Sequence, residues 1–394
     1  MKPESRTGAD AAWLRLAFRP FFLAAGLFAV LAMALWTALY DFGWQMPAGG
    51  LAALDWHAHE MLFGYALAVV AGFLLTAIRN WTGLQTLHGP SLLALFALWT
   101  AARLGSLVPG LPLPLVAAAD LGFNAFLVLA ALLPVARARQ WMQIGIIVKL
   151  LLLLAANALF YLGVTGQLAD GRRLGLYAGL YLILSLILMI GRRVIPFFIQ
   201  NGVGYPFQAR NRKWLDVTVL VLFLLFALSD LARLDALTAA LAAVLFVLHG
   251  IRIVGWHTRG IWSKPLLWVL FLAYGFIILG FGLKTASIVA GVSPFLALHA
   301  FTVGGIGLMT LGMMARVTLG HTGRNVFEPP AAVRWMFGLL AAGAVTRVLL
   351  PMLVPARYDL WIALSQGLWI LAFGLFVAVY APMLVTPRID GKPG

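Results

Sequence analysis

Histidine is the residue type in this sequence best suited to chemistry, and most of its seven copies lie at the ends or in the interior of long apolar segments. Imidazole is the commonest protein ligand of haem iron and of copper. By the topology derived below, one face of the membrane carries His57, His59 and His299, and the other half carries His88, His249, His257 and His321. Two separated groups would suit a redox protein with two metal sites.

A cluster of two histidines and two carboxylates, in the run DWHAHEM at residues 55–61, opens the second apolar segment. On a continuous helix His57 and His59 would point about 200° apart, so they share a metal only if His57 lies on non-helical backbone at the helix entrance. Glu60 and Asp55 could fix an imidazole tautomer by hydrogen bonding. The alternative is a set of polar interfacial residues that cap the helix.

The tenth apolar segment carries His299 near its start, and Gly304, Gly305 and Gly307 follow. These glycines would let either a flat macrocycle or a neighbouring helix approach the backbone, and both interpretations stay open. The segment ends at His321, 22 residues later. That spacing is roughly 33 Å along a helix and reaches the opposite face. We therefore predict an outer metal centre with His59 and His299 as ligands, and His57 as an alternative or additional one.

A second centre is expected in the other half of the membrane. His249 shares a helix face with Arg252 at i, i+3, whereas His257 lies roughly 12 Å farther along the axis. Arginine forms charge-assisted hydrogen bonds to carboxylates such as haem propionates. The predicted ligands are His249, His257 and His321, and the predicted propionate partners are Arg252, Arg316 and Arg324. Simple packing and the cation excess of a cytoplasmic surface are the alternatives, and His88 is expected in a surface loop.

The segments that position these residues are predicted to be membrane-spanning helices. Of the 394 residues, 63% are hydrophobic and 10% are charged, with a mean hydropathy of +0.97, which excludes an ordinary soluble domain. Twelve spans are predicted at 20–40, 59–78, 90–108, 112–134, 141–163, 174–191, 214–232, 236–255, 265–289, 294–317, 333–354 and 360–384. The expected fold is all-α and polytopic, with a single transmembrane domain over residues 1–394.

Charge sets the expected orientation. The chain carries 28 Lys and Arg against 13 Asp and Glu, a formal net charge of +15, and most of the cations lie in alternate connecting segments. Because positive residues near span ends are retained in the cytoplasm, both termini are predicted inside. The excess also favours anionic membrane lipids as partners and argues against nucleic acid, since no basic soluble domain is present to bind it. The lack of Cys excludes disulfides, Cys-ligated iron–sulfur clusters and haem attachment through Cys-x-x-Cys-His.

Four polar residues lie deep in two neighbouring apolar segments, Asp120 and Asn124 in the fourth span and Lys149 and Asn157 in the one after it. Asp120 and Asn124 share a helix face at i, i+4. A buried ammonium group needs a partner or a water path. Two interpretations are open: a structural hydrogen-bond network between helices, and a proton route toward a reducing centre.

The sequence resembles the NnrS family in five stretches that spread over most of the chain. They are FRPFF at 18–22, WHAHEM at 56–61, GFLLTA at 72–77 with NWTG at 80–83, GRRVIP at 191–196, and HA at 299–300 through RVTLGHTGR at 316–324. The resemblance implies a bacterial inner-membrane protein of twelve spans that contains haem and copper. It also implies a part in the response to nitric oxide and nitrosative stress.

On this resemblance we expect a non-covalent b-type haem, copper, nitric oxide or a nitrosyl species as ligand, and an electron donor that the sequence does not identify. The protein would bind or redox-process nitric oxide at His-ligated centres, and would be an oxidoreductase if it turns over. The main alternative is a multi-span transporter or channel whose histidines carry protons or metal ions. A membrane sensor or assembly partner is the third, disfavoured because no soluble signalling domain is expected.

Overall fold

The computed structural model of the protein describes residues 12–46 and 51–392, and every regular element in this part of the chain is a helix. In chain order the elements are η1 (Ala12–Leu14), α1 (Phe18–Tyr40), α2 (Ala53–His59), η2 (Glu60–Ala66), α3 (Leu67–Thr82), α4 (Gly89–Gly105), α5 (Leu113–Arg137), η3 (Trp141–Gln143), α6 (Ile144–Val164), α7 (Gly171–Gly202), α8 (Lys213–Leu231), α9 (Asp235–Trp256), η4 (Arg259–Ser263), α10 (Pro265–Val289), α11 (Pro294–His299), η5 (Ala300–Gly307), α12 (Leu308–His321), α13 (Ala332–Val348), α14 (Leu350–Leu353), η6 (Pro355–Arg357) and α15 (Tyr358–Val385). The predicted all-α class is confirmed for these residues.

Proline and glycine mark several helix ends. Helices α10 and α11 begin at Pro265 and Pro294, whose fixed φ and missing N–H suit a first turn. Helix α3 ends at Thr82 and is capped by Gly83, which has a φ of +69° and whose N–H donates to the carbonyl of Arg79. These local signals explain why the predicted and observed span ends lie close together.

Eleven helical segments are long and apolar enough to cross a membrane: Phe18–Tyr40, Ala53–Thr82, Leu113–Arg137, Trp141–Val164, Gly171–Gly202, Lys213–Leu231, Asp235–Trp256, Pro265–Val289, Pro294–His321, Ala332–Leu353 and Pro355–Val385. The predicted span 90–108 forms α4, which has only 17 residues. At ~1.5 Å per residue, α4 is about 26 Å long, less than the ~30 Å of the hydrocarbon core. Within the described residues, length therefore gives eleven spans where twelve were predicted, and α4 accounts for the difference.

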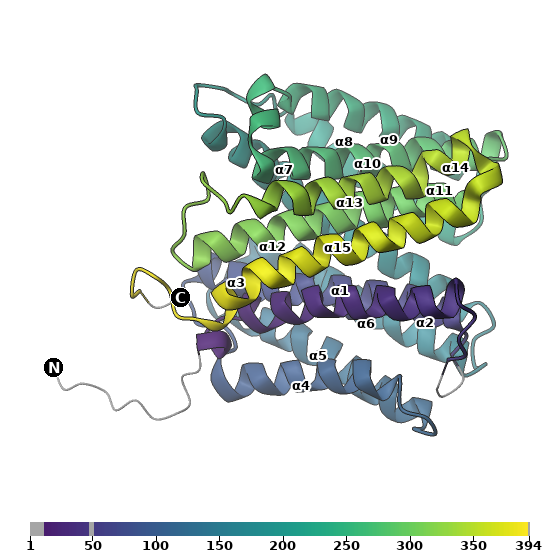
Figure 1. Cartoon of the computed structure of the whole chain (residues 1–394), viewed down its shortest axis with the longest axis horizontal. Coiled ribbons are helices and arrows are strands. Elements are labelled where there is room, and N and C mark those ends of the chain that lie inside the picture. Colours follow the sequence, from purple (N-terminus) through teal and green to yellow (C-terminus); the bar gives the residue numbers. More distant parts are fainter. Residues whose placement is uncertain (1–11, 47–50, 393–394) are drawn as a thin grey trace. The chain divides into compact units, whose positions relative to one another are not determined.

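The beginning of α1 and the end of α15 lie together (Figure 1). Nη1 of Arg19 donates to the carbonyl oxygens of Met383, Leu384 and Thr386 at 3.3, 3.0 and 2.6 Å. Because both ends are held at one place, the described chain completes an even number of crossings if each long helix crosses once. Helix α4 would then have to cross as well. The cytoplasmic location of the termini stays a prediction.

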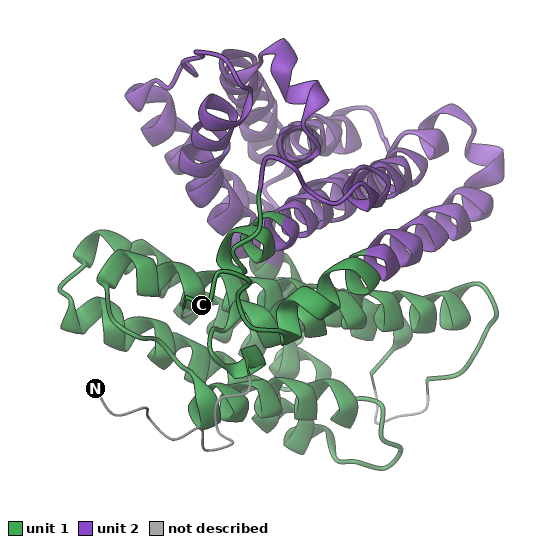
Figure 2. Ribbon diagram, turned by 60° about the vertical axis from the view of Figure 1, so that its left-hand side comes forward, with its two compact units in different colours: residues 1–179, 316–325, 376–394 green, residues 180–315, 326–375 purple. Residues whose placement is uncertain are grey.

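The chain forms two compact helical units (Figure 2). Unit 1 contains residues 1–179, 316–325 and 376–394, and unit 2 contains residues 180–315 and 326–375. Three long helices, α7, α12 and α15, contribute residues to both units. The prediction of one transmembrane domain over the whole chain stays a prediction, and each unit is described by itself below.

Aromatic side chains fill the core of unit 1. Phe18, Phe21 and Phe22, in the first turns of α1, are fully buried. Gly72 of α3 lies against Phe22, and a Cβ added at Gly72 would lie 2.9 Å from that ring. This glycine therefore allows α1 to pack closely on the span that carries His59.

Phe281 of α10 lies at the centre of an aromatic cluster in unit 2. Its ring makes edge-to-face contacts with Phe223 and Phe226 of α8 and with Phe301 of η5, at centroid distances of 6.1, 5.4 and 5.1 Å. The ring also stacks with His249 of α9 at 5.6 Å and an interplanar angle of 5°. The cluster holds three helices and η5 around the histidine.

Two π-helical segments interrupt the histidine-bearing spans. Segment η2 directly follows His59, and segment η5 directly follows His299. A π segment changes the helical register and frequently marks a functional position. Both principal ligands predicted for the outer centre therefore lie at an α-to-π transition.

Candidate functional site

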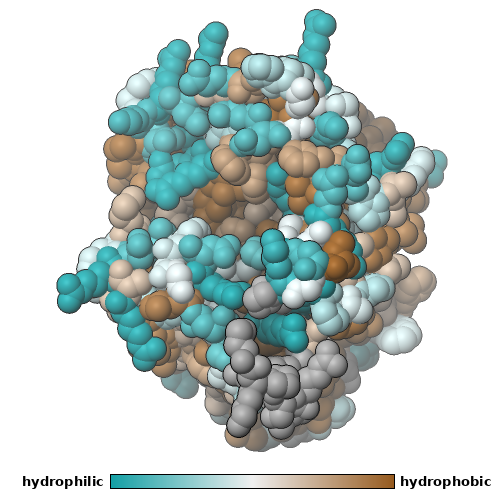
Figure 3. Space-filling model, turned by 90° about the vertical axis from the view of Figure 1, so that its left-hand side faces the viewer, coloured by the Kyte–Doolittle hydropathy of each residue, from teal (hydrophilic) through white to brown (hydrophobic). Residues whose placement is uncertain are grey.

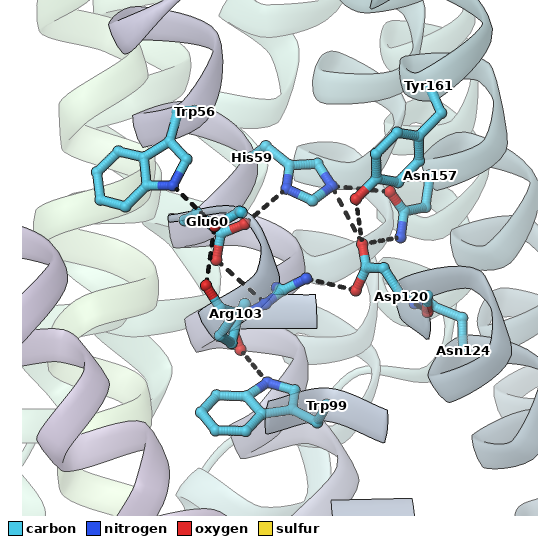
Figure 4. A network of polar contacts seen from close by, with 11 residues as sticks. Trp56, His59, Glu60, Trp99, Arg103, Asp120, Asn124, Asn157 and Tyr161 are labelled. Carbon is cyan, nitrogen blue, oxygen red and sulfur yellow. Dashed lines mark hydrogen bonds and ion pairs between the residues drawn. The ribbon is translucent and has the colours of Figure 1, made fainter. Parts of the chain in front are cut away.

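A buried polar network surrounds His59 in unit 1 (Figure 4). His59 is 1% exposed, and both of its ring nitrogens are engaged. Nδ1 lies 3.1 Å from Oε1 of Glu60, while Nε2 lies 2.9 Å from Oδ1 of Asn157 and 3.3 Å from Oδ2 of Asp120. The ring also stacks on Phe160 at 4.4 Å. These contacts fix the orientation of the imidazole.

Arg103 of α4 links the two carboxylates of this network. Its Nη2 donates to Oδ1 of Asp120 at 2.5 Å, and its Nε forms an ion pair with Oε2 of Glu60 at 3.2 Å. The other oxygen of Asp120 accepts hydrogen bonds from Nδ2 of Asn157 at 2.8 Å and from Oη of Tyr161 at 3.1 Å. Side chains from η2, α4, α5 and α6 thus meet the end of α2 inside unit 1.

The charges of this network balance only if the imidazole is protonated. Glu60 and Asp120 carry two negative charges, and Arg103 carries one positive charge, so a neutral His59 leaves a net charge of −1. A net charge buried among membrane spans is costly. The network is therefore suited to hold a proton on His59, and a metal could bind this imidazole only after one of its hydrogen bonds is broken.

The four polar residues of the fourth and fifth predicted spans do not all belong to the network. Asp120 and Asn157 are directly hydrogen-bonded, and Asn124 donates to the backbone carbonyl of Asp120 at 2.7 Å. Lys149 is half-buried, and its ammonium group donates to the carbonyl of Gly145 at 3.4 Å. The interhelical hydrogen-bond network is thus present and includes Asp120 and Asn157.

His57 and Asp55 have partners outside this network. The His57 ring stacks on Trp36 at 4.2 Å and an interplanar angle of 17°. Asp55 accepts a hydrogen bond from Arg172 at 2.9 Å. His57 belongs to the helical segment α2, as His59 does, so the non-helical backbone that joint ligation required is not observed.

His249 in unit 2 differs from His59 in having one unsatisfied nitrogen. The residue is fully buried, and its Nδ1 shares a 2.5 Å hydrogen bond with Oη of Tyr274. Its Nε2 is also buried and has no hydrogen-bond partner. If Nδ1–H donates to Tyr274, Nε2 carries a free lone pair of the kind that binds a metal.

A charged chain of residues adjoins Tyr274. Arg252 donates from Nη1 to Oη of Tyr274 at 3.3 Å and from Nη2 to Oδ1 of Asp216 at 2.6 Å. The second oxygen of Asp216 accepts from Arg192 at 2.9 Å. The His249 position is therefore supported by a hydrogen-bonded series that runs through four helices, α9, α10, α8 and α7.

His299 is held at both ring nitrogens. Nδ1–H donates to the carbonyl oxygen of Phe295 at 2.7 Å, and Nε2 accepts from Nη2 of Arg347 at 3.2 Å. The guanidinium of Arg347 also lies over the ring of Tyr358, 5.8 Å from its centroid. His299 belongs to unit 2 and His59 to unit 1, so a centre that they share stays a prediction.

Side chains of neighbouring helices fill the space beside the glycines that follow His299. A Cβ added at Gly304 would lie 2.3 Å from the Phe276 ring, and one at Gly305 would lie 2.6 Å from Ile277. A Cβ at Gly307 would lie 2.8 Å from Trp369. Of the two interpretations left open by the sequence, close helix packing is the one that these contacts support.

The other histidines have separate surroundings. His257 is exposed beyond the end of α9 and accepts a hydrogen bond from Trp262 at 3.2 Å. His321, in unit 1, packs on Phe18 at 5.5 Å. His257 is thus not at the His249 site, and joint ligation with His321 stays a prediction because the two lie in different units. His88 is exposed in the loop before α4, as predicted.

No three His, Cys, Asp or Glu side chains among residues 12–46 and 51–392 are grouped so as to hold a metal ion. Sequence reasoning also missed three residues that bond to the predicted histidines directly or through a carboxylate: Arg103, Tyr274 and Arg347. A charged or phenolic side chain inside an apolar span needs a polar partner. That signal was present for all three, although it does not identify the partner.

These features define a polytopic helical membrane protein with buried histidines held by polar partners. The sequence model of the family described as NnrS protein matches residues 12–388. The chain therefore belongs to the NnrS family, as its motifs predicted. A comparison with curated proteins gave no match. Family membership fits a membrane protein of the nitric oxide response.

Proposed function

We propose that the protein is a haem- and copper-containing protein of the bacterial inner membrane that binds nitric oxide or a nitrosyl species during nitrosative stress. The observation that carries the haem assignment is the buried, unpartnered Nε2 of His249. An unsatisfied buried polar atom costs about 1–3 kcal/mol, and a bond to iron would satisfy it. Membership in the NnrS family supports the same class of function.

In this proposal Nε2 of His249 would hold the haem iron. Tyr274 fixes the imidazole through Nδ1, and Arg252 keeps a positive charge beside the phenol. A bound haem would supply an iron that takes nitric oxide at an open coordination position. Of the three predicted propionate partners, Arg252 donates a hydrogen bond to Tyr274, the partner of His249. Arg316 and Arg324 belong to unit 1, and their part in holding a propionate stays a prediction.

Copper is proposed on family membership and not on a donor set. Among the described residues no three suitable side chains are grouped, and the ring nitrogens of His59 and His299 are engaged. A copper ion at either histidine would have to break one of these bonds. We therefore assign no chemical step to copper.

The test is the optical spectrum and iron content of the purified protein, produced with haem supplied. The wild type is expected to show a Soret band that shifts when nitric oxide is added to the reduced protein. His249→Ala should lose the band while the protein still inserts and elutes as a single species. His88→Ala is the matched control, because His88 is an exposed loop residue, and it should keep the band.

Two results would contradict the proposal in different ways. A colourless wild-type protein without iron would remove the haem assignment altogether. A His249→Ala variant with full haem content would keep the haem but remove its assigned ligand.

A proton-coupled transporter or channel is the second candidate function. The observation that favours it is the His59 network, in which ionisable side chains from several spans are buried together. Under this function His59→Gln would abolish transport in vesicles, and the wild-type protein would contain no haem.

A further inference from the structure

An arginine cluster lies at the end of unit 1 where α1 begins and α15 ends. We define it as Arg15, Arg19, Arg79, Arg324 and Arg388. Arg15, Arg324 and Arg388 lie close enough to Arg19 to interact with it electrostatically. Arg19, Arg79 and Arg388 interact in the same way with the neighbouring His321. Hydrophilic side chains gather over the face at which this end of the helices lies (Figure 3).

Arg19 is fully buried, but its protein partners satisfy only part of its guanidinium. Nη1 alone makes the three bonds to the carbonyls at the end of α15. Nε and Nη2 are buried and have no hydrogen-bond partner. A guanidinium has five donors in a fixed fork, so these two atoms form an unused edge that suits an oxyanion.

Arg324 presents a second unsatisfied donor. Its Nη1 is buried without a hydrogen-bond partner. The backbone turns at Gly323, which has a φ of +79°, and the Arg324 N–H then donates to the carbonyl of Leu319 at 2.9 Å. This turn at the end of α12 places Arg324 among the other arginines.

In the described part of unit 1, the five arginines of the cluster are balanced by too few carboxylates to neutralise their positive charge. Asp390 is paired with Arg388 through contacts of 2.8 and 2.6 Å. Those hydrogen bonds lower the pKa of the Asp390 carboxyl below its usual range, so it stays ionised and occupied by Arg388. Five guanidinium groups minus this one carboxylate leave a net charge of +4. A bound anion would relieve the repulsion around buried Arg19.

We propose that the arginine cluster binds a phosphate group through the free edges of Arg19 and Arg324. The cluster lies where α1 starts at Phe18, α3 ends at Thr82, α12 ends at His321 and α15 ends at Val385. Ends of membrane spans lie at the level of lipid headgroups, and arginine binds phosphate bidentately. An anionic phospholipid and free phosphate share this chemistry, and the experiment separates them.

The experiment uses the purified, delipidated full-length protein and three probes. Phosphatidylglycerol supplies a lipid phosphate, diacylglycerol supplies the same chains without phosphate, and inorganic phosphate is compared with chloride at equal ionic strength. Binding is measured by native mass spectrometry and by the shift in unfolding temperature. We expect phosphatidylglycerol to bind and diacylglycerol not to bind. A response to inorganic phosphate as strong as that to phosphatidylglycerol would also support the site and would identify free phosphate as its source.

Variants connect the binding to the cluster. Arg324→Gln should weaken phosphatidylglycerol binding about tenfold or more, as expected for the loss of one charge-assisted hydrogen bond. Because Nη1 of Arg324 makes no hydrogen bond within the protein, the Arg324→Gln variant is expected to fold. Arg334→Gln, at an exposed position outside unit 1, removes the same charge and should leave binding unchanged. Arg19→Lys keeps the charge but loses the fork, and should also weaken binding.

Three outcomes would overturn the proposal. In the first, wild type and Arg324→Gln bind phosphatidylglycerol equally. In the second, diacylglycerol binds as well as phosphatidylglycerol. In the third, Arg324→Gln keeps its phosphate binding but loses haem, which would assign the cluster to propionate carboxylates. Haem content is measured in the same samples, so failure of this proposal can be told apart from failure of the haem assignment.

Discussion

Three histidines of this protein differ in which of their ring nitrogens already have a polar partner. His59 and His299 have a polar partner at each nitrogen, whereas His249 has one at Nδ1 alone. A satisfied imidazole is stable as it is, and an unsatisfied one favours a further ligand. Residue type and spacing predicted all three histidines as metal ligands. Their hydrogen bonds distinguish them.

The role of Tyr274 can be tested through haem affinity. Removing its hydroxyl in Tyr274→Phe leaves Nδ1 of His249 without its orienting partner. Loss of such a partner lowers metal affinity about 10–100-fold. The dissociation constant of haem, measured by titration of the haem-free protein, should rise by that factor. Tyr380→Phe is the control, because the Tyr380 hydroxyl is buried without a partner, and equal haem affinity in the two variants would refute this role.

The His59 network should contribute strongly to stability. Asp120→Asn leaves buried Arg103 without a charged partner on that side, and breaking a buried pair costs about 3–5 kcal/mol. Asp55→Asn removes an ion pair to Arg172, which is 53% exposed, and should cost about 0–1 kcal/mol. Unfolding of purified variants in detergent measures both. Adding Arg103→Met to Asp120→Asn should recover part of the loss, and equal effects of the two single changes would contradict this account.

At the scale of the elements, small residues decide how closely the spans approach. Gly72 admits the Phe22 ring between α1 and α3 in unit 1, and Gly304 admits the Phe276 ring between η5 and α10 in unit 2. The π segments η2 and η5 add a change of register next to His59 and His299. In both units, the packing of the spans therefore helps to determine where the histidine side chain lies.

Gly304→Ala tests the packing interpretation. Its Cβ would lie 2.3 Å from Cγ of Phe276, so we expect the variant to be destabilised by about 1–3 kcal/mol. Gly338→Ala in α13 is the matched control, because no atom lies within 4 Å of the added Cβ there. That change should be neutral or stabilising by up to about 1 kcal/mol. A Gly304→Ala variant that is stable but has lost haem would favour the macrocycle interpretation.

At the scale of the whole molecule, the number of crossings depends on α4. Arg19 ties the start of α1 to the end of α15, and Arg79 at the end of α3 lies near His321 with Arg19. An even number of crossings between the described ends requires the short helix α4 to span. Five arginines lie at this end, and positive residues near span ends favour a cytoplasmic location: Arg15, Arg19, Arg79, Arg324 and Arg388.

Single cysteines can test this topology, since the chain has none of its own. Gln85→Cys and Val108→Cys flank α4 at exposed positions. An impermeant thiol reagent added outside intact cells should label Val108→Cys and spare Gln85→Cys until the membrane is opened. Labelling of both positions from one side would show that α4 does not cross.

The sequence by itself determined the helical class, the approximate spans, the family and the histidines worth examining. These follow from hydropathy, from Pro and Gly at helix ends, and from short motifs, which are all local properties. Local reasoning also grouped Glu60 with His59 and recognised Asp120 and Asn157 as polar residues in need of partners. The length of α4 was overestimated because apolar residues continue into the turn that follows Gly105.

Only the tertiary structure decided which side chains meet. Asp120 reaches Asn157 across 37 residues, Tyr274 reaches His249 across 25, and Arg19 reaches the carbonyl of Leu384 across 365. Phe276, Ile277 and Trp369 fill the space beside Gly304, Gly305 and Gly307 that a macrocycle would need. The periodicity of one helix specifies which face is buried but not which helix covers it, because that choice depends on the packing of all the helices together.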